Sequence, residues 1–222
     1  MDFSPLAVSC KIAFFSTLLT FITGILAAWG AGLTKKAKPV LDSLLSLPLV
    51  LPPTVIGFLL LILFSKNGAF GAFLSKTGLP LLFTWQGGVV AATVVSFPVM
   101  YRTTRGAFDQ IDEIIISAAR TLGMNEFTIF RKIMLPVSTP GIAAAVILSF
   151  ARALGEFGAT IMVAGNIPGK SQTMAVAVYT AMQGGNKALA FRWCAVIFAI
   201  SLVILLLMNI FTERFAIRRW HK

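Results

Sequence analysis

Arg152 and Glu156 are the residues with the clearest chemical potential, because both lie inside a long apolar run. They are four residues apart, so a helix would place them on one face. A charge within a membrane costs on the order of 3 kcal/mol on insertion scales, which predicts that both side chains face the interior of a helical bundle. A structural ion pair is the favoured interpretation. Contact with an ion crossing the membrane is the alternative, although a strong fixed charge would hold such an ion instead of passing it.

The second chemically distinct region is a polar island from Ser117 to Pro136, set between apolar runs. It carries Arg120, Glu126, Arg131 and Lys132, which cannot easily lie in hydrocarbon, so it is expected to face water. Its pattern predicts a helix, a tight turn and a second short helix.

Local signals define the two helices of the island. Asp109 or Asp112 is suited to cap the first helix, and Gly123 stands where a residue with left-handed backbone is wanted. Asn125 is suited to cap the second helix, and Pro136 is expected to end it. A basic helix-turn-helix in a soluble protein would suggest DNA binding, but flanking apolar segments tie this one to a membrane surface. Nucleic acid is therefore not expected as a partner.

Catalytic and metal-binding patterns are not found in the sequence. It contains no GxxxxGK[ST] phosphate loop and no zinc-ligand spacing, and its lone histidine, His221, lies in the basic tail. Cys10 and Cys194 are too far apart in sequence to suggest a metal site or a disulfide framework, and both are expected to be buried small apolar residues. We therefore expect no enzyme activity, no cofactor and no metal.

Composition predicts the fold class. The 222 residues are 57% hydrophobic and 12% charged, with a mean hydropathy of +0.87. These values, with several apolar runs of about 20 residues, predict an all-α polytopic transmembrane helical bundle in a single domain, 1–222. The expected spans are about five, at 12–33, from about 41 to 64, 88–100, 140–164 and 193–210. Pro98 is expected to break the end of the third span.

Prolines mark the second span as irregular. Pro48, Pro52 and Pro53 each lack a backbone donor, so this helix is expected to be kinked or broken. Such a break survives in a membrane only where protein or a watery cavity satisfies the freed groups. Pro52 and Pro53 are therefore candidates for lining a pathway, while a kink that only shapes packing is the equal alternative.

Charge asymmetry predicts the topology. The scheme places twelve Lys and Arg on the side of the polar island and six on the opposite side, with Arg152 between them, out of 19 in all. The positive-inside rule then predicts that the N-terminus is outside and the C-terminus is cytoplasmic. Membrane lipid accounts for the basic excess. The segment 166–192, with a short helix around 173–182, is expected outside.

A resemblance to a known family rests on the polar island. Ala118-Ala119, Gly123, Ile133 and Leu135-Pro136 occur with the spacing found in the EAA loop of the permease subunits of binding-protein-dependent ABC importers. Ser117 stands where that family usually has Glu. The resemblance implies that the loop, 109–138, couples the bundle to a separate cytoplasmic ATPase. The implied coupling residues are Ser117, Ala118, Ala119, Leu122, Gly123, Ile133, Leu135 and Pro136.

A second resemblance covers the stretch from Ser149 to Gly169, which is similar to molybdate and sulfate permeases. The sequence GEFGATI within this stretch is more similar to the molybdate permeases, and so is the proline-rich second span. The resemblance implies a homodimer in a prokaryotic cytoplasmic membrane that imports molybdate by alternating access, with an ABC ATPase subunit and an extracytoplasmic substrate-binding protein as partners.

Three other functions remain open. The first is a sulfate or thiosulfate permease of the same family. A secondary transporter or channel is the second, but the coupling loop and the absence of an inverted repeat argue against it. A membrane-embedded enzyme is the third, and it would need a polar cluster that only Arg152 and Glu156 approach.

Overall fold

The computed structural model describes residues 2–34, 38–66, 68, 70–72 and 81–220, with only the backbone described for 211–220. Most of these residues are helical, and none of them lies in a strand. The helices are α1 (Ser4–Leu33), α2 (Lys38–Val50), α3 (Pro53–Phe64), α5 (Trp85–Asp109), α6 (Glu113–Thr121), α7 (Glu126–Ile129), the π-helix η1 (Phe130–Met134), α8 (Leu135–Val137), α9 (Thr139–Leu154), α10 (Gly158–Val163), α11 (Met174–Gln183) and α12 (Lys187–Trp220).

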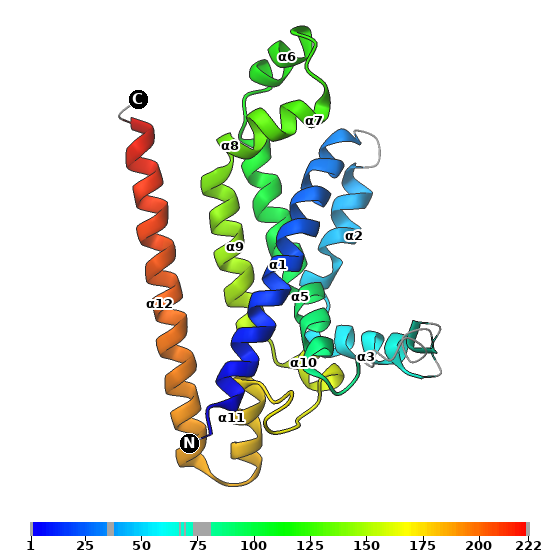
Figure 1. Cartoon of the computed structure of the whole chain (residues 1–222), viewed down its shortest axis with the longest axis vertical. Coiled ribbons are helices and arrows are strands. Elements are labelled where there is room, and N and C mark those ends of the chain that lie inside the picture. The colour runs from blue at the N-terminus through cyan, green and yellow to red at the C-terminus, as the bar shows by residue number, and fades with distance from the viewer. Residues whose placement is uncertain (1, 35–37, 67, 69, 73–80, 221–222) are drawn as a thin grey trace.

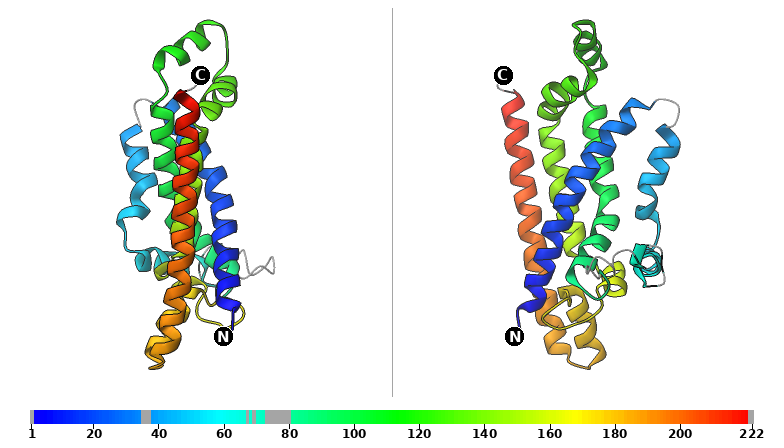
Figure 2. Two further views of the ribbon diagram at one scale, coloured as in Figure 1. Left: turned by 90° about the vertical axis from the view of Figure 1, so that its left-hand side faces the viewer. Right: turned by 45° about the vertical axis from the view of Figure 1, so that its right-hand side comes forward.

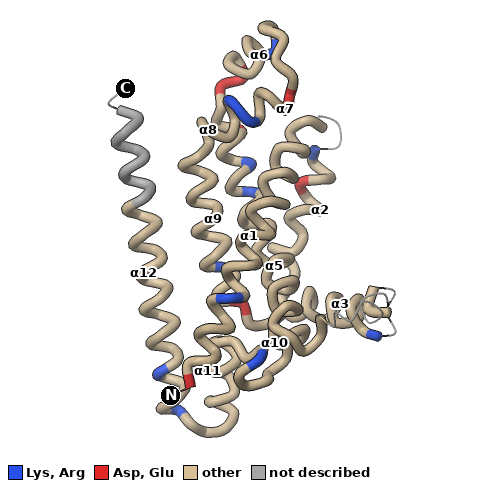
Figure 3. Tube along the Cα trace, in the orientation of Figure 1, with Lys and Arg blue, Asp and Glu red and all other residues tan. Residues whose placement is uncertain are grey.

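The long helices run side by side along the longest axis of the molecule (Figure 1). α6 and α7 stand at the end where α12 terminates, while α10, α11 and the N-terminus lie at the opposite end. Both views in Figure 2 show this arrangement. Charged residues gather mainly toward the two ends, with few between them (Figure 3). This distribution fits a membrane protein whose middle layer contacts hydrocarbon.

α5 is the central helix, because it packs against α1, α2, α3, α9 and α10. Small residues allow the helices to approach closely: a Cβ added at Gly24 would lie 2.6 Å from Met100 Cγ, and one at Gly88 would lie 2.6 Å from Ile12 Cδ1. Helices in a membrane associate largely through such close packing. Ala91 and Ala92 of α5 are fully buried, as this central position requires.

Two helical segments, α1 and 187–210 of α12, are long and apolar enough to span a membrane alone, with mean hydropathies of 1.9 and 2.6. Two bent pairs qualify together: α2 with α3, and residues 126–137 with α9. α5 has 25 residues, or about 37 Å of helix, which exceeds a hydrocarbon core of about 30 Å. Because other helices pack around α5, its side chains face protein more than lipid and can be less apolar than those of an exposed span. These elements form the predicted polytopic helical bundle, in which two to four of the described segments qualify as spans by length and composition.

The predicted break in the second span is confirmed. α2 and α3 meet at an angle of 103°, with Pro52 as the residue that precedes α3 and Pro53 as its first residue. Proline is suited to the first turn of a helix because the missing N–H would have no partner there. α3 therefore leaves the bundle axis and projects sideways (Figure 1). The predicted helix around 173–182 is also confirmed as α11, capped by Thr173.

Three sequence-based predictions are wrong. Pro98 does not end the third span: its ring is buried inside α5, which continues to Asp109, and this packing offsets the lost hydrogen bond. The fourth span is not continuous from 140 to 164, because α9 ends at Leu154 and α10 begins at Gly158. Cys10 and Cys194 are exposed on the outside of the chain, not buried.

Residues 67, 69 and 73–80, between the expected second and third spans, and several lysines used in the topology count lie outside the described residues. These lysines are Lys35, Lys36, Lys76 and Lys222.

The contact between α3 and α10 generates a stability prediction. A Cβ at Gly57 would lie 2.8 Å from Ala159 Cα, so Gly57→Ala should push the two helices apart and cost about 1–3 kcal/mol. Gly30→Ala is the matched control, since its Cβ meets nothing within 4 Å. Thermal unfolding of the purified protein in detergent should show a lower midpoint for Gly57→Ala alone. Equal midpoints would contradict this packing.

Candidate functional site

The candidate site is the helical hairpin formed by α6, α7, η1 and α8, residues 113–137, at one end of the bundle. Asp112 caps α6, and its Oδ1 accepts a hydrogen bond of 2.8 Å from the Ile114 N–H. Ser117 and Ala118 are exposed, whereas Ala119 is buried. α6 thus exposes the small residues Ser117 and Ala118 together with the larger Ile114 and Ile115.

The turn at Gly123 follows the Schellman pattern. The Gly123 N–H donates to the Arg120 carbonyl at 2.9 Å, and the Met124 N–H donates to the Ala119 carbonyl at 3.1 Å. Gly123 has a φ of +79°, a conformation that a residue with a Cβ rarely adopts. The prediction of a turn glycine here is confirmed. Leu122, just before it, is 82% exposed at the tip of the hairpin, an unusual position for a leucine.

The second arm begins as predicted but ends differently. Asn125 caps α7, since its Oδ1 accepts from the Thr128 N–H at 2.8 Å. The arm then passes through η1, where the Leu135 N–H donates to the Phe130 carbonyl. Pro136 does not end the helix, because it occupies the first turn of α8, where its missing N–H is tolerated, and the arm continues to Val137. Ile133 and Leu135 are half-buried, and Pro136 is exposed.

An ion pair joins the two arms. Arg120 Nε lies 2.7 Å from Glu126 Oε1, and Nη2 lies 3.2 Å from Oε2. These hydrogen bonds hold the pKa of Glu126 below its ordinary value and raise the pKa of Arg120 above its own. The bidentate geometry fixes the angle between the arms more than it stabilises the fold, since both groups are largely exposed.

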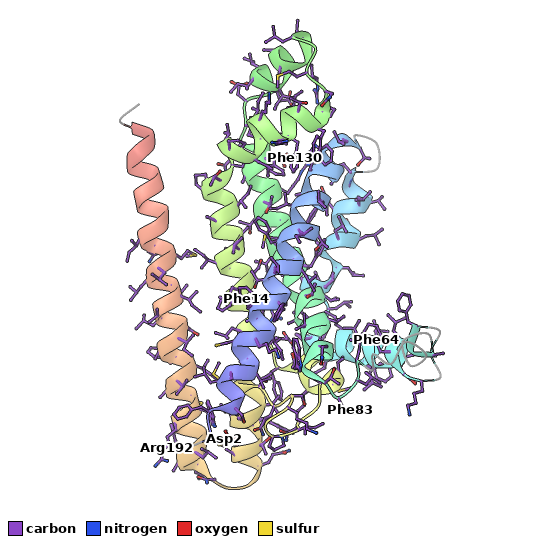
Figure 4. The ribbon with its side chains drawn as sticks, viewed as in Figure 1. Asp2, Phe14, Phe64, Phe83, Phe130 and Arg192 are labelled. Carbon is purple, nitrogen blue, oxygen red and sulfur yellow. The ribbon has the colours of Figure 1, made fainter. Side chains whose placement is uncertain are left out.

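Aromatic side chains connect the hairpin to the spans. Phe130 of η1 is buried and stacks on Trp29 of α1, with ring centroids 4.7 Å apart. It also meets Phe108 of α5 edge-on at 6.1 Å, and Phe127 contacts Trp29 at 6.2 Å. Figure 4 shows Phe130 between the hairpin and the long helices. The sequence reasoning missed these residues, although the three-residue spacing of Phe127 and Phe130 was an available signal.

A polar network supports the same end of the bundle. Arg105 of α5 donates to the Ala28 carbonyl of α1 at 3.0 Å and pairs with Asp109 at 3.2 Å. The Tyr101 hydroxyl donates to the Asp42 carboxylate of α2. α1, α2 and α5 are therefore held together directly beneath the hairpin.

Arg152 and Glu156 do form the predicted ion pair, with Nη1 and Oε2 2.6 Å apart. They do not share a helix face, because Arg152 is in the last turn of α9 and Glu156 follows the end of that helix. The Glu156 side chain is 2% exposed, and its other oxygen accepts from the Ala159 N–H at 2.8 Å in α10. The Glu156 carboxylate thus bonds to Arg152 in α9 and to the Ala159 N–H in α10, which lie on either side of the break between these helices.

The two breaks in the bundle lie against each other. A Cβ at Gly158 would lie 3.1 Å from Pro53 Cβ and 3.1 Å from the Thr54 backbone nitrogen. The structure therefore brings the four pathway candidates, Pro52, Pro53, Arg152 and Glu156, to one region where α3 and α10 interrupt the long helices. Irregular backbone in a membrane is expected where it is enclosed by protein or lines a cavity.

The arrangement consists of an exposed hairpin packed against the spans at one end of the bundle and paired helix breaks toward the other. Among the described residues, no group of three or more His, Cys, Asp or Glu is placed to hold a metal ion. Residues 20–219 match the family of binding-protein-dependent transport system inner membrane components. The chain belongs to this family.

Family members among curated proteins cover nearly the whole chain. The molybdenum transport system permease protein ModB of Escherichia coli (strain K12) is 41% identical over 93% of this chain and 91% of its own. A putative molybdenum transport system permease protein, YvgM of Bacillus subtilis (strain 168), is 41% identical over 91% of this chain and 90% of its own. The sulfate transport system permease protein CysT of Salmonella typhimurium is 36% identical over 95% of this chain and 76% of its own.

The fold also matches solved importers. A bacterial ABC transporter involved in the import of the acidic polysaccharide alginate has a TM-score of 0.77 at 18% identity, covering 95% of this chain and 78% of its own. The family therefore places this chain in a membrane as a multi-pass protein. The predicted all-α permease fold is confirmed.

The Arg152–Glu156 pair generates a prediction about buried charge. Arg152→Ala leaves a buried carboxylate with a single described hydrogen bond, and we expect a loss of about 1–3 kcal/mol. Arg152→Ala with Glu156→Gln removes the unpaired charge and should recover part of that stability. Unfolding midpoints in detergent measure both. A double variant as unstable as the single one, or more so, would mean that the two residues act separately.

Proposed function

We propose that this chain is the membrane subunit of an ABC importer that carries molybdate across the prokaryotic cytoplasmic membrane. The observation that carries the proposal is the exposed hairpin at Ala118–Gly123, joined to α1 and α5 through Phe130. Relatives named as molybdenum permeases over more than nine-tenths of the chain support molybdate as the cargo. The lower identity to the sulfate permease makes sulfate or thiosulfate the second candidate. A secondary transporter would have no use for the hairpin.

The hairpin is proposed as the contact for a separate ABC ATPase, on which ATP is hydrolysed. Ser117, Ala118, Leu122 and Gly123 form its exposed tip and would enter a groove on that subunit. Ile133, Leu135 and Pro136 support the tip from the second arm. The region 109–138 of the single domain 1–222 would then move with the ATPase, and the aromatic contact at Phe130 would transmit that motion to α1 and α5.

Alternating access requires that the spans adopt two packings with different contacts. We infer that the paired breaks at Pro52–Pro53 and 155–157 supply the deformable region, because helix–helix contacts there run through short elements. The Arg152–Glu156 pair would hold one packing together. A second copy of the chain would complete a central pathway, and an extracytoplasmic binding protein would deliver the anion.

The orientation follows from the same proposal. The hairpin end faces the cytoplasm, where an ATPase is available, so the C-terminus of α12 is cytoplasmic and the N-terminus is outside. Arg105, Arg120, Arg131 and Lys132 then lie on the cytoplasmic side, as the positive-inside rule requires.

Uptake of labelled molybdate tests the cargo. Cells or vesicles that carry this subunit with its ATPase and binding protein should show ATP-dependent molybdate uptake that excess tungstate blocks and excess sulfate does not. Omission of the ATPase is the control. Block by sulfate, or uptake of labelled sulfate instead, would transfer the assignment to the sulfate importers and leave the coupling proposal intact.

Substitution at Gly123 tests the coupling. Gly123→Val should strongly reduce co-purification of the ATPase, because a β-branched residue at a φ of +79° distorts the tip. Gly123→Asn is the matched control, since asparagine tolerates the left-handed region and should retain association. Membrane insertion of both variants is checked by fractionation. Normal ATPase co-purification with Gly123→Val would rule out the hairpin as the contact.

A further inference from the structure

A pocket lined in part by two lysines lies at the end of the bundle opposite the hairpin, apart from the residues assigned above. It has a volume of about 480 Å³ and is formed by the second turn of α1, the start of α5 and the loop before α11. The lining side chains that carry the argument are Lys11, Phe83, Thr84, Trp85, Gln86 and Lys170. Figure 4 shows Phe83 beside this end of the molecule, near α3 and α10.

The pocket is electropositive. Lys11 and Lys170 both line it, and none of the described lining residues is acidic. Neither lysine forms an ion pair with a carboxylate within the described part of the chain. The N-terminus of α5, a helix of 25 residues, also faces the pocket through Thr84, Trp85 and Gln86, and a helix N-terminus carries partial positive charge.

Both lysines are exposed, and one of them, Lys11, contacts an aromatic ring. The Lys11 ammonium lies 3.7 Å from the centre of the Trp85 ring, a cation–π contact. The Phe83 N–H donates to the Val163 carbonyl at 2.8 Å, and its φ of 59° is unusual for a residue with a large side chain. This bond fixes the start of α5 against α10. Lys11 and the start of α5 are therefore positioned by contacts that do not involve a ligand.

The surroundings suit a charged group at a membrane surface. Lys11 shares a face of α1 with Phe15, Leu18, Leu19 and Ile22, which are all at least 40% exposed. Trp85, whose ring centroid lies 5.7 Å from that of Phe15, is the residue type that gathers at membrane–water interfaces. A phosphate at the pocket could thus carry acyl chains along α1, while a free oxyanion would need only the two lysines and the α5 amides.

We propose that this pocket binds a tetrahedral oxyanion, whether as the phosphate of a lipid headgroup or as a free dianion. Two lysine charges and a helix N-terminus match one group with one or two negative charges. Such exposed contacts are weakened by salt, so the site would hold its ligand in rapid exchange. The inference does not rest on the proposed function, since it concerns binding to this chain alone.

The test uses the purified, delipidated full chain in detergent. Sulfate, molybdate, inorganic phosphate and short-chain phosphatidylglycerol are titrated at constant ionic strength, with sodium chloride as the baseline, and tryptophan fluorescence is recorded. Trp85→Phe identifies the part of the signal that comes from the pocket. We expect a saturable change that is lost in Trp85→Phe and weakens at higher salt.

Charge-removing variants decide whether the lysines bind the ligand. Lys11→Gln and Lys170→Gln should each weaken binding about fivefold, the effect of about 1 kcal/mol at an exposed charge. Lys187→Gln, at the start of α12 and outside the pocket lining, is the matched control and should bind normally.

Binding of phosphatidylglycerol alone would assign the site to lipid, and binding of free ions as well would assign it to soluble oxyanions. No saturable change with any ligand, or unchanged affinity in both lysine variants, would overturn the proposal. Because neither ATPase nor transport enters the measurement, that failure would leave the proposed function standing.

Discussion

The packing of Phe130 between Trp29 and Phe108 is the contact on which the position of the hairpin depends. The outer surface of α6 and α7 is largely exposed, and the Arg120–Glu126 pair ties the two arms only to each other. Phe130 belongs to the hairpin but is buried with side chains from α1, α5 and α9, among them Ile25, Phe108 and Ile142. Each aromatic pair contributes on the order of 0.5–1.5 kcal/mol beyond area burial, so the joint resists independent movement of the hairpin.

The tight packing at the hairpin end of the bundle contrasts with the packing around the helix breaks at the opposite end. Beneath the hairpin, α1, α2 and α5 are further held by Arg105 and by the Tyr101–Asp42 hydrogen bond. At the paired breaks, short helices α3 and α10 carry the contacts instead. If the proposed coupling holds, a displacement of the hairpin would pass along α1 and α5 to the region where α3 and α10 interrupt the long helices.

Glu156 shows how the fold satisfies polar groups away from water. Breaking a helix within a membrane protein frees backbone donors, and each unsatisfied one costs free energy. The Glu156 carboxylate accepts from the first turn of α10 and pairs with Arg152 at the end of α9. One carboxylate thus accepts a hydrogen bond from a backbone N–H freed by the helix break and neutralises the charge of Arg152. The Arg152–Glu156 pair therefore contributes to the fold itself as well as being a candidate for the pathway.

The sequence by itself determined the features that depend on neighbours in the chain. Composition required a helical membrane bundle. The cap at Asn125, a cap at Asp109 or Asp112, the turn at Gly123 and the break at Pro52–Pro53 all follow from local backbone chemistry, and the structure has Asp112 as the cap. The family resemblance added a prediction, the coupling role of the hairpin, that local chemistry alone could not suggest.

Only the tertiary structure decided the features that depend on packing between distant segments. Helix α5 continues through Pro98 because neighbouring helices bury the ring, while α9 stops at Leu154, where Glu156 turns to bond the amide of Ala159. Phe130 contacts Trp29, and Lys11 contacts Trp85, although each pair is too far apart in the sequence for a local pattern to predict the contact. Propensity acts over a few residues, but the burial of a side chain is set by whichever helix lies opposite it.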